Sequence, residues 1–256
     1  MGMQKLDRTG SPFFSIITVV LNGAPFISDC IDSLRNQTFR NFEYIVIDGG
    51  STDGSIEIIE KNLDQIGIFI SESDFGIYDA MNKGIKLAKG KYIGIINSDD
   101  MYNFQALEIV FNHLLAQTNE CVIYGGITGT SPQIQYENIS HFELPKKMIY
   151  HPATFVASSV YKRLGAFDLS YRIAADYEFI LRCFVKGVPF IRVEDSIAFY
   201  REGGFSHKHQ YRSIFETFLI QIRAYPKKSP KTFMRFCKVA LGTFVRNNIK
   251  FLAIRS

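Results

Sequence analysis

The chain has 256 residues, of which 46% are hydrophobic and 21% are charged. This composition can bury the core of one large domain, or of one domain with an appendage. The four cysteines are far apart and include no C-x-x-C pair, which argues against both a disulfide framework and a structural zinc site.

The two ends of the chain differ in charge, although the net charge is only +4. Residues 226–256 carry eight Lys or Arg and no Asp or Glu, which leaves 21 basic and 25 acidic side chains before them. The tail mixes these charges with apolar residues, so it is predicted to be either a helical hairpin packed on the domain or an interfacial helix on an anionic membrane. Of these two predictions, we favour the interfacial helix on an anionic membrane.

Export and a membrane span are not expected. No apolar run approaches the ~18 residues of a spanning helix, and the first residues lack the apolar core of a signal peptide. The cysteine usage fits a reducing cytoplasm. A cytoplasmic protein held peripherally on the inner face of the plasma membrane is the expectation.

The first half alternates predicted strands and helices. Four apolar, mostly β-branched runs, at 13–22, 43–50, 67–73 and 91–100, are typical of buried strands. Between them, apolar residues recur at helical spacing. These sets are Ile27, Ile31 and Leu34; Ile56, Ile59 and Leu63; and Ile77, Met81, Ile85 and Ala88. The alternation predicts parallel strands joined by right-handed crossovers, in a doubly wound, mostly parallel open α/β sheet with helices on both faces.

The second half is less regular. Residues 121–128, 151–158 and 189–200 are predicted strands, the last forming one or two, and 173–187 is a predicted helix that stops at Gly187. We expect a loosely held N-terminus at 1–12, a domain at 13–208 and a basic helical extension at 209–256. Within the domain, 13–102 would bind a nucleotide and 103–208 would face an acceptor.

Three carboxylates follow predicted strands. Asp48 ends the second strand, and Asp99 and Asp100 end the fourth. Ligands of doubly wound sheets lie beyond the carboxyl ends of the strands, so the three should share one edge. A plain polar turn is the alternative, but two adjacent carboxylates suit Mg²⁺ or Mn²⁺ with phosphate oxygens completing the shell.

Two loops could contribute to the same edge. Residues 48–55 form a glycine-rich strand-to-helix turn without the G-x-x-x-x-G-K-[ST] phosphate loop, so a nucleoside triphosphatase is not expected. Residues 73–92 place Asp74, Tyr78, Asp79, Asn82 and Lys83 around a helix start, where either a solvated helix face or a ligand contact is predicted.

Asp176 follows the apolar residues 173–175 at the start of a predicted helix. Helix capping by Asp176, with Glu178 on the surface, is the structural interpretation. A half-buried Asp176 could instead act as a general base. Among the histidines, His113 is expected to be structural, His151 and His209 are notable but unassigned, and His207 could lie on a loop that closes over a diphosphate.

These motifs together resemble the family 2 glycosyltransferases, inverting enzymes with the GT-A fold. The likeness is carried by "SIITVVLNG", "SLRNQTFRNFEYIVIDGGSTDGS", "DFGIYDAMNKGIKLAKGKYIGIINSDD", "HPATFV", "RLGAFD" and "AADYEFILR". It covers roughly residues 14–205 and leaves the tail outside. The resemblance implies a GT-A domain, and the helical C-terminal appendage is predicted from the tail itself.

The resemblance also implies roles for individual residues. Asp176 matches the catalytic base, and Asp100, with Asp99, matches the metal-binding acidic motif. His207 is a further predicted metal ligand, which rests on its place after a glycine pair and not on the resemblance. The family often has a second acidic residue where this chain has Gly49. The residues expected to contact the nucleotide sugar are Val20, Asn22, Asp48, Ser51, Asp53, Asp74, Tyr78, Asn82, Lys83, Ser98 and Asp99.

The predicted activity is therefore transfer of a sugar from a nucleotide sugar, most simply a UDP sugar, to a hydroxyl of a saccharide acceptor, with Mn²⁺ or Mg²⁺ on the diphosphate. A lipid-linked acceptor would suit a membrane location, as in polysaccharide or O-antigen assembly. A sugar nucleotidyltransferase and a catalytically inactive sugar-nucleotide or glycan-binding protein are the alternatives. No nucleic-acid motif is present, and the oligomeric state is left open.

Overall fold

The structure is a computed structural model, and it describes residues 10–117, 120–129, 136–201, 209–226, 234 and 236–240. Within these residues, one sheet of eight strands has the order β3-β2-β1-β4-β7-β6-β8-β5. The strands are β1 (Phe14–Val20), β2 (Phe42–Asp48), β3 (Ile68–Ser71), β4 (Tyr92–Asn97), β5 (Met101–Tyr102), β6 (Val122–Gly129), β7 (Thr154–Ala157) and β8 (Phe190–Tyr200).

The sheet is mostly parallel, as predicted. Strands β3, β2, β1 and β4 are all parallel, and β6 is parallel to β8. Strand β7 runs antiparallel to β4 and β6, and β5 runs antiparallel to β8. The parallel half is formed by strands of the segment 13–102, whose nucleotide binding stays a prediction, and the mixed half contains β5 and the strands of the later segment.

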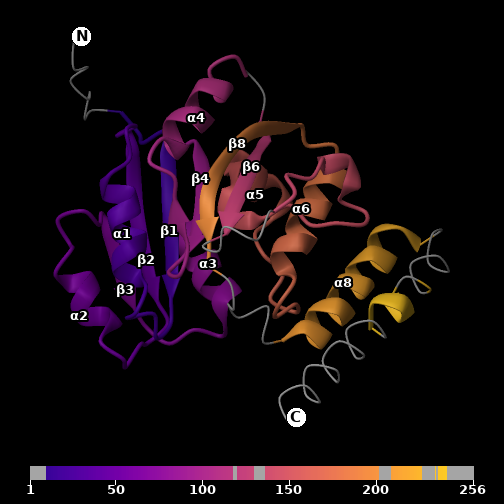
Figure 1. The fold of residues 1–256 in the computed structure, drawn as a ribbon, viewed down its shortest axis with the longest axis horizontal. Coiled ribbons are helices and arrows are strands. Elements are labelled where there is room, and N and C mark those ends of the chain that lie inside the picture. The colour runs from indigo at the N-terminus through magenta and orange to yellow at the C-terminus, as the bar shows by residue number, and fades with distance from the viewer. Residues whose placement is uncertain are drawn as a thin grey trace, which may run out of the picture.

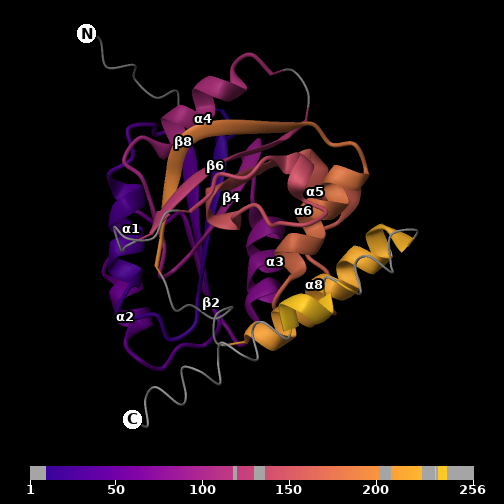
Figure 2. The ribbon, with the colours of Figure 1, turned by 45° about the vertical axis from the view of Figure 1, so that its right-hand side comes forward.

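Helices cover both faces of the sheet. Figure 2 shows α1 and α2 on one side of the strands and α3, α5 and α6 on the other. The α-helices are α1 (Ile27–Arg35), α2 (Ser55–Glu60), α3 (Ile77–Leu87), α4 (Ala106–Leu114), α5 (Ser158–Leu164), α6 (Ala175–Val185) and α8 (Gln210–Ala224); the short 3₁₀ helices are η1 (His141–Glu143) and η2 (His151–Ala153).

The core explains why the apolar runs became central strands. Every residue of β1 is buried, because β1 is flanked by β2 and β4 and covered by helices on both faces. Helix α3 comes so close to β1 that a Cβ at Gly84 would lie 2.5 Å from a methyl carbon of Ile17. A side chain at position 84 would therefore push α3 away from the sheet.

Two local predictions were wrong in detail. The segment 151–158 is not all strand, because His151–Ala153 form η2 and Pro152, which has no N–H, cannot donate to a strand ladder. Helix α2 ends at Glu60, so Leu63 is 47% exposed, and Ile66 is buried there instead. Of the two alternatives predicted for the segment 189–200, the structure shows one continuous strand, β8, with an irregular register against β6.

Helix α8 packs against the domain. Figures 1 and 2 both place it beside α6, and its buried residues are Glu216, Ile220 and Gln221. The Gln221 side-chain amide donates to the hydroxyl of Tyr177 on α6 at 3.0 Å. The predicted domain boundaries remain predictions, and residues 1–9 and most of the basic tail lie outside the described part. Among the described helices, none has the length and apolarity needed to cross a membrane.

Candidate active site

The carboxyl ends of the parallel strands lie level with one another. Val20 is opposite Asp48 in the β1–β2 register, and Val19 is opposite Asn97 of β4. The Gly49 N–H donates to the Val20 carbonyl at 2.9 Å and joins the two strand ends. Asp48 and the acidic turn after β4 are therefore at one edge of the sheet, as predicted from the order of strands and helices in the sequence.

Asp48 is fully buried at this edge. Its Oδ2 accepts hydrogen bonds from the backbone N–H groups of Gly50 and Ser51, both at 3.0 Å, and from the Ser71 hydroxyl at 2.7 Å. Its Oδ1 is buried without a hydrogen-bond partner among the described residues. A buried acceptor of this kind is costly unless a donor satisfies it, so Asp48 has capacity for a ligand N–H or O–H.

The loops after β1 and β2 hold each other in place. The Asn22 N–H donates to the Ser51 hydroxyl at 2.8 Å, and the Asn22 side-chain oxygen accepts from the Thr52 N–H at 2.9 Å. Asn22 has φ of 53°, a left-handed conformation that asparagine tolerates better than most residues. Asp53 accepts from the Ala24 and Ser55 N–H groups, and the hydrogen bond from the Ser55 hydroxyl is the main reason that the pKa of Asp53 is lowered.

Asp74 lies directly over Gly49. A Cβ at Gly49 would be 2.4 Å from Asp74 Oδ2, so the carboxylate occupies the space in which a side chain at position 49 would begin. The resemblance described above leads us to expect a second acidic residue at this position. The structure thus brings a carboxylate to the same place from a loop 25 residues further along the chain.

The polar residues of α3 point mainly at the protein. The Asn82 side-chain amide makes two hydrogen bonds with the backbone of Phe167, at 2.9 and 3.0 Å. Lys83 donates to the Ser73 carbonyl and pairs with Glu72 at 2.8 Å and Asp79 at 3.5 Å. These contacts make Asn82 and Lys83 supports of neighbouring loops, and their contact with a nucleotide sugar stays a prediction.

Asp99 and Asp100 follow β4 in the turn that leads to β5. Asp100 is 1% exposed, and its Oδ1 accepts from the Arg201 N–H at 3.1 Å. Burial, followed by the neighbouring Asp99 charge, raises the pKa of Asp100 from 3.8 to about 7. Burial also raises the pKa of Asp99, against the opposing charges of Arg201 and His151. Ser98 lies beside the loop after β1, since a Cβ at Gly23 would be 2.8 Å from the Ser98 hydroxyl.

The acidic turn fits a divalent cation. Two adjacent carboxylates in a buried setting disfavour their own ionisation, and a cation between them would reverse this effect. Among the described residues, no group of three or more His, Cys, Asp or Glu side chains could enclose a metal ion. Mg²⁺ and Mn²⁺ do not require such a cage, because one or two carboxylates with substrate phosphates and water complete their shell. The predicted ligand His207 lies outside the described residues.

Asp176 is 7% exposed in the first turn of α6. Its Oδ1 accepts from the Tyr78 hydroxyl at 2.8 Å and from the Tyr177 N–H at 2.9 Å, while its Oδ2 lies 3.5 Å from His151 Nδ1. Asp176 is not the N-cap of the helix, because Ala174 holds that position, and its carboxylate also contacts side chains from α3 and η2. Tyr78, expected to contact the nucleotide, is buried with its hydroxyl on Asp176.

His151 connects the base candidate to the acidic turn. Burial lowers the pKa of His151, whereas the charges of Asp176 and Asp99 act in the opposite direction. The imidazole therefore lies within electrostatic range of both carboxylates, and its Nε2 is buried without a hydrogen-bond partner in the described part of the chain. Asp99, His151 and Asp176, which are 52 and 25 positions apart in the sequence, therefore form one site.

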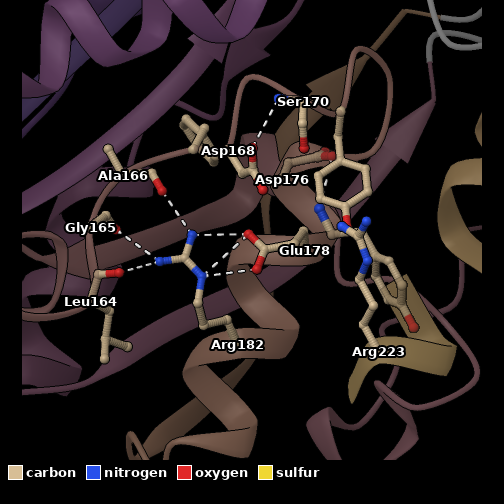
Figure 3. Close-up of polar contacts among 12 residues, drawn as sticks. Leu164, Gly165, Ala166, Asp168, Ser170, Asp176, Glu178, Arg182 and Arg223 are labelled. Carbon is tan, nitrogen blue, oxygen red and sulfur yellow. Dashed lines mark hydrogen bonds and ion pairs between the residues drawn. The ribbon is translucent and has the colours of Figure 1, made fainter. Parts of the chain in front are cut away.

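Glu178 is not the surface residue that the sequence suggested. It is paired with Arg182 at 2.9 Å, and the Arg182 guanidinium also donates to the carbonyls of Leu164, Gly165 and Ala166 (Figure 3). The Arg182 guanidinium thus satisfies the carbonyl groups at the C-terminal end of α5 and holds the loop after α5 against α6.

Sequence reasoning missed or left unassigned three residues near the site. His151 belongs to the segment "HPATFV", which contributed to the family resemblance but did not indicate a role for His151. Arg201 donates its backbone N–H to Asp100, pairs with Asp29 at 3.0 Å and stacks on the ring of Phe26, and no local motif marks it. Glu216 of α8 is buried against the residues that precede α6, and it lies in the segment that the sequence suggested to be a separate extension.

The sheet is mostly parallel, and an acidic turn follows β4 at the edge formed by the carboxyl ends of its strands. A buried carboxylate, Asp176, lies beside this turn. This arrangement is that of a glycosyltransferase of the GT-A type. The sequence model described as "Glycosyl transferase family 2" matches residues 15–174, which ends two residues before Asp176. The chain belongs to the family 2 glycosyltransferases.

Similar proteins of known sequence agree with this assignment. The "PGL/p-HBAD biosynthesis glycosyltransferase" of Mycobacterium bovis (strain BCG / Pasteur 1173P2) is 33% identical over 180 residues, which is 68% of this chain and 70% of that protein. An uncharacterised glycosyltransferase of Rickettsia typhi is 32% identical over 187 residues, 67% of this chain and 58% of its own length.

Solved structures show the same fold. S. aureus TarS 1-349 in complex with UDP-GlcNAc has a TM-score of 0.69 at 17% identity and covers 82% of this chain, which spans 66% of that structure. The mannosyltransferase PcManGT from Pyrobaculum calidifontis, in complex with GDP-Man and Mn2+, has a TM-score of 0.67 at 18% identity and covers 96% of this chain and 81% of its own.

Proposed function

We propose that the protein transfers a sugar from a UDP sugar to a saccharide hydroxyl, with inversion and with a divalent metal on the diphosphate. The observation that carries the proposal is the convergence of Asp99, Asp100 and Asp176 on one site, with His151 in electrostatic range of Asp99 and Asp176. Such a site provides both requirements of the reaction, a place for the diphosphate charge and a base for the attacking hydroxyl.

The nucleoside part of the donor would lie over the ends of β1 and β2. Asp48 Oδ1, which has no hydrogen-bond partner within the described ranges, and the carboxylate of Asp74 over Gly49 are two acceptors for donor groups of the base or ribose. Both are consistent with a uracil ring, whose N–H donates a hydrogen bond. The UDP-GlcNAc bound to TarS and the GDP-Man bound to PcManGT show that this fold accommodates nucleotide sugars of either type.

Asp100 and Asp99 would hold Mn²⁺ or Mg²⁺, with Asp100 as the principal ligand. When bound, the metal would neutralise charge that builds on the departing diphosphate. The Arg201 N–H orients Asp100 Oδ1, and the guanidinium of Arg201 adds positive charge at the same edge.

Asp176 would accept the proton of the acceptor hydroxyl at Oδ2. The other oxygen, Oδ1, is held by Tyr78 and Tyr177, which leaves Oδ2 with only the long contact to His151 among the hydrogen bonds and ion pairs of the described residues. The hydroxyl oxygen then forms the bond to the anomeric carbon from the face opposite the nucleotide, the bond to the diphosphate breaks, and a single displacement inverts the centre.

The acceptor proposed is a saccharide, most simply a lipid-linked one, as in polysaccharide or O-antigen assembly. A pocket lined by Phe75, Tyr78, Leu169 and Arg172 lies beside the base, and Phe75 is 90% exposed. The exposed apolar residues Tyr211 and Phe215 of α8 precede the basic tail. They support peripheral attachment to the cytoplasmic face of an anionic membrane.

The test is metal-dependent release of UDP from UDP sugars, with water or a supplied saccharide as acceptor. With Mn²⁺ present, we expect release from at least one of UDP-glucose, UDP-galactose, UDP-GlcNAc and UDP-GalNAc. Asp176→Asn should lower kcat by ~10² to 10⁴ and leave donor binding nearly unchanged, because a placed base contributes about that much. Wild-type turnover in this variant would exclude Asp176 as the base.

A further inference from the structure

Helix α8 inserts a buried carboxylate into the loop that precedes the base. Glu216 is 5% exposed, although Glu is rarely buried without partners. Its Oε2 accepts from the backbone N–H groups of Ile173 at 2.8 Å and Ala174 at 3.1 Å, and its Oε1 accepts from that of Arg172 at 3.1 Å. One side chain therefore binds three consecutive N–H groups.

These three N–H groups lie at the start of α6. Ala174 is the N-cap residue and has no side-chain oxygen to cap the helix. The N–H groups at a helix start have no partner within the helix, and a negative charge there is also favoured by the helix dipole. Glu216 binds the N–H of the N-cap residue and of the two residues before it, and so brings a negative charge from α8 to the N-terminus of α6.

The state of Glu216 suits this role. Burial would raise its pKa, but hydrogen bonds from Arg212 and the three N–H groups outweigh burial and lower the pKa below its usual value. The Arg212 Nε donates to Oε1 at 2.7 Å from one helical turn earlier. Glu216 is thus ionised at neutral pH.

The loop held by Glu216 is connected to Asp176 through the hydroxyl of Tyr78 as well as through the backbone. The Tyr78 hydroxyl contacts the Ile173 carbonyl and Asp176 Oδ1, both at 2.8 Å. A hydroxyl has one proton, so Tyr78 shares it between the two acceptors. The position of the Ile173 peptide therefore sets the geometry of the hydrogen bond that orients the base.

A second contact from α8 supports the same loop. Arg223 donates to the hydroxyl of Tyr171 at 2.5 Å, and its guanidinium lies 5.6 Å from that ring's centroid. Figure 3 shows Arg223 of α8 in the same close-up as Asp176 and Glu178. The helix contacts the segment 171–174 through both side chains.

We propose that Glu216 is a positioning residue, which orients the carboxylate of Asp176 through the 172–174 loop and Tyr78. The inference rests on the proposed function, since it assigns the geometry of the same base. It makes α8 part of the catalytic domain, whereas the sequence suggested that residues 209–256 form an extension.

The test uses the full chain with Mn²⁺ and the UDP sugar that gives the fastest UDP release. Glu216→Gln keeps the size of the side chain but turns an NH₂ group towards backbone N–H donors. We expect kcat to fall about 10- to 100-fold, as for small displacements of a catalytic group, while KM for the donor changes less than about twofold.

Three comparisons separate positioning from general stability. In an Asp176→Asn background, Glu216→Gln should cause no further loss of kcat, because both changes act on one group. Glu216→Asp, which keeps the charge on a shorter chain, should recover part of the activity. Gln221→Met, which removes the other buried polar contact of α8 with α6, should lower Tm but leave kcat near that of the wild type.

The inference is overturned if folded Glu216→Gln turns over at the wild-type rate, or if it loses the same factor with Asn at position 176. If Glu216→Gln does not fold, a folded Glu216→Asp with wild-type kcat overturns it equally. If the wild type releases no UDP, or Asp176→Asn is fully active, the proposed function itself fails, and this result is distinct from a failure at Glu216 alone.

Discussion

Asp100→Asn should stabilise the metal-free protein while weakening its response to metal. Asp100 is 1% exposed and next to Asp99, and its pKa is raised from 3.8 to about 7. A folded-state pKa above the unfolded value means that ionised Asp100 destabilises the fold. The full rise corresponds to about 4 kcal/mol at pH 8, and we take this as an upper limit.

The amide should fit the same position. Its oxygen can still accept from the Arg201 N–H. In the wild type, the Asn97 NH₂ group donates to Asp100 Oδ2, and the Asn97 side-chain oxygen is buried without a partner among the described residues. If the Asn97 amide rotates by half a turn, the new NH₂ group at position 100 can donate to that oxygen. We therefore expect a net gain of about 1 to 4 kcal/mol at pH 8. For a chain of this size, each 1 kcal/mol raises Tm by roughly 2 to 4 °C.

The sign of the effect depends on pH. Above pH 7, Asp100 is charged in both states and the wild type bears the full penalty. As pH falls through 7 towards 4, folded Asp100 takes up its proton first, so the wild type recovers stability. Below about pH 4 both states are protonated, and the advantage of Asn should vanish.

Thermal unfolding between pH 4 and 8, in chelator and in Mn²⁺, measures these effects. Mn²⁺ should raise Tm of the wild type at pH 8 and raise that of Asp100→Asn much less. Asp64→Asn makes the same chemical change at an exposed position and should leave Tm unchanged. A metal-free Asp100→Asn that is less stable than wild type at pH 8, or equally stabilised at pH 4, would refute this reasoning.

The remaining predictions concern the donor site and the tail. Gly49→Ala should weaken UDP binding about tenfold by calorimetry, because its Cβ would lie 2.4 Å from Asp74 Oδ2 and displace that carboxylate. In an Asp74→Ala background the same change should have little effect, and an equal loss in both backgrounds would contradict a donor role for Asp74. The full chain should float with anionic liposomes, and a chain that ends at Tyr225 should not, since each basic residue near the surface contributes about 1 kcal/mol; equal flotation would contradict attachment through the tail.

The local sequence was enough to determine the parallel half of the fold. The β-branched runs can be buried on both faces only between helices, and strand–helix alternation allows few topologies. It also determined that Asp48 and the Asp99–Asp100 turn share one edge, because carboxyl ends of parallel strands always meet there. The antiparallel insertion of β7 was not predictable in the same way, since Thr154–Ala157 is too short to state its direction.

The supports of the site were decided only by tertiary structure. Nothing near Asp176 in the chain indicates that its oxygens face Tyr78, 98 residues earlier, and His151. The same holds for Asp74 over Gly49 and for Glu216 at the start of α6. Sequence patterns report which residues a chain buries and where its strands end, whereas the orientation of a buried carboxylate depends on donors that packing brings from distant segments.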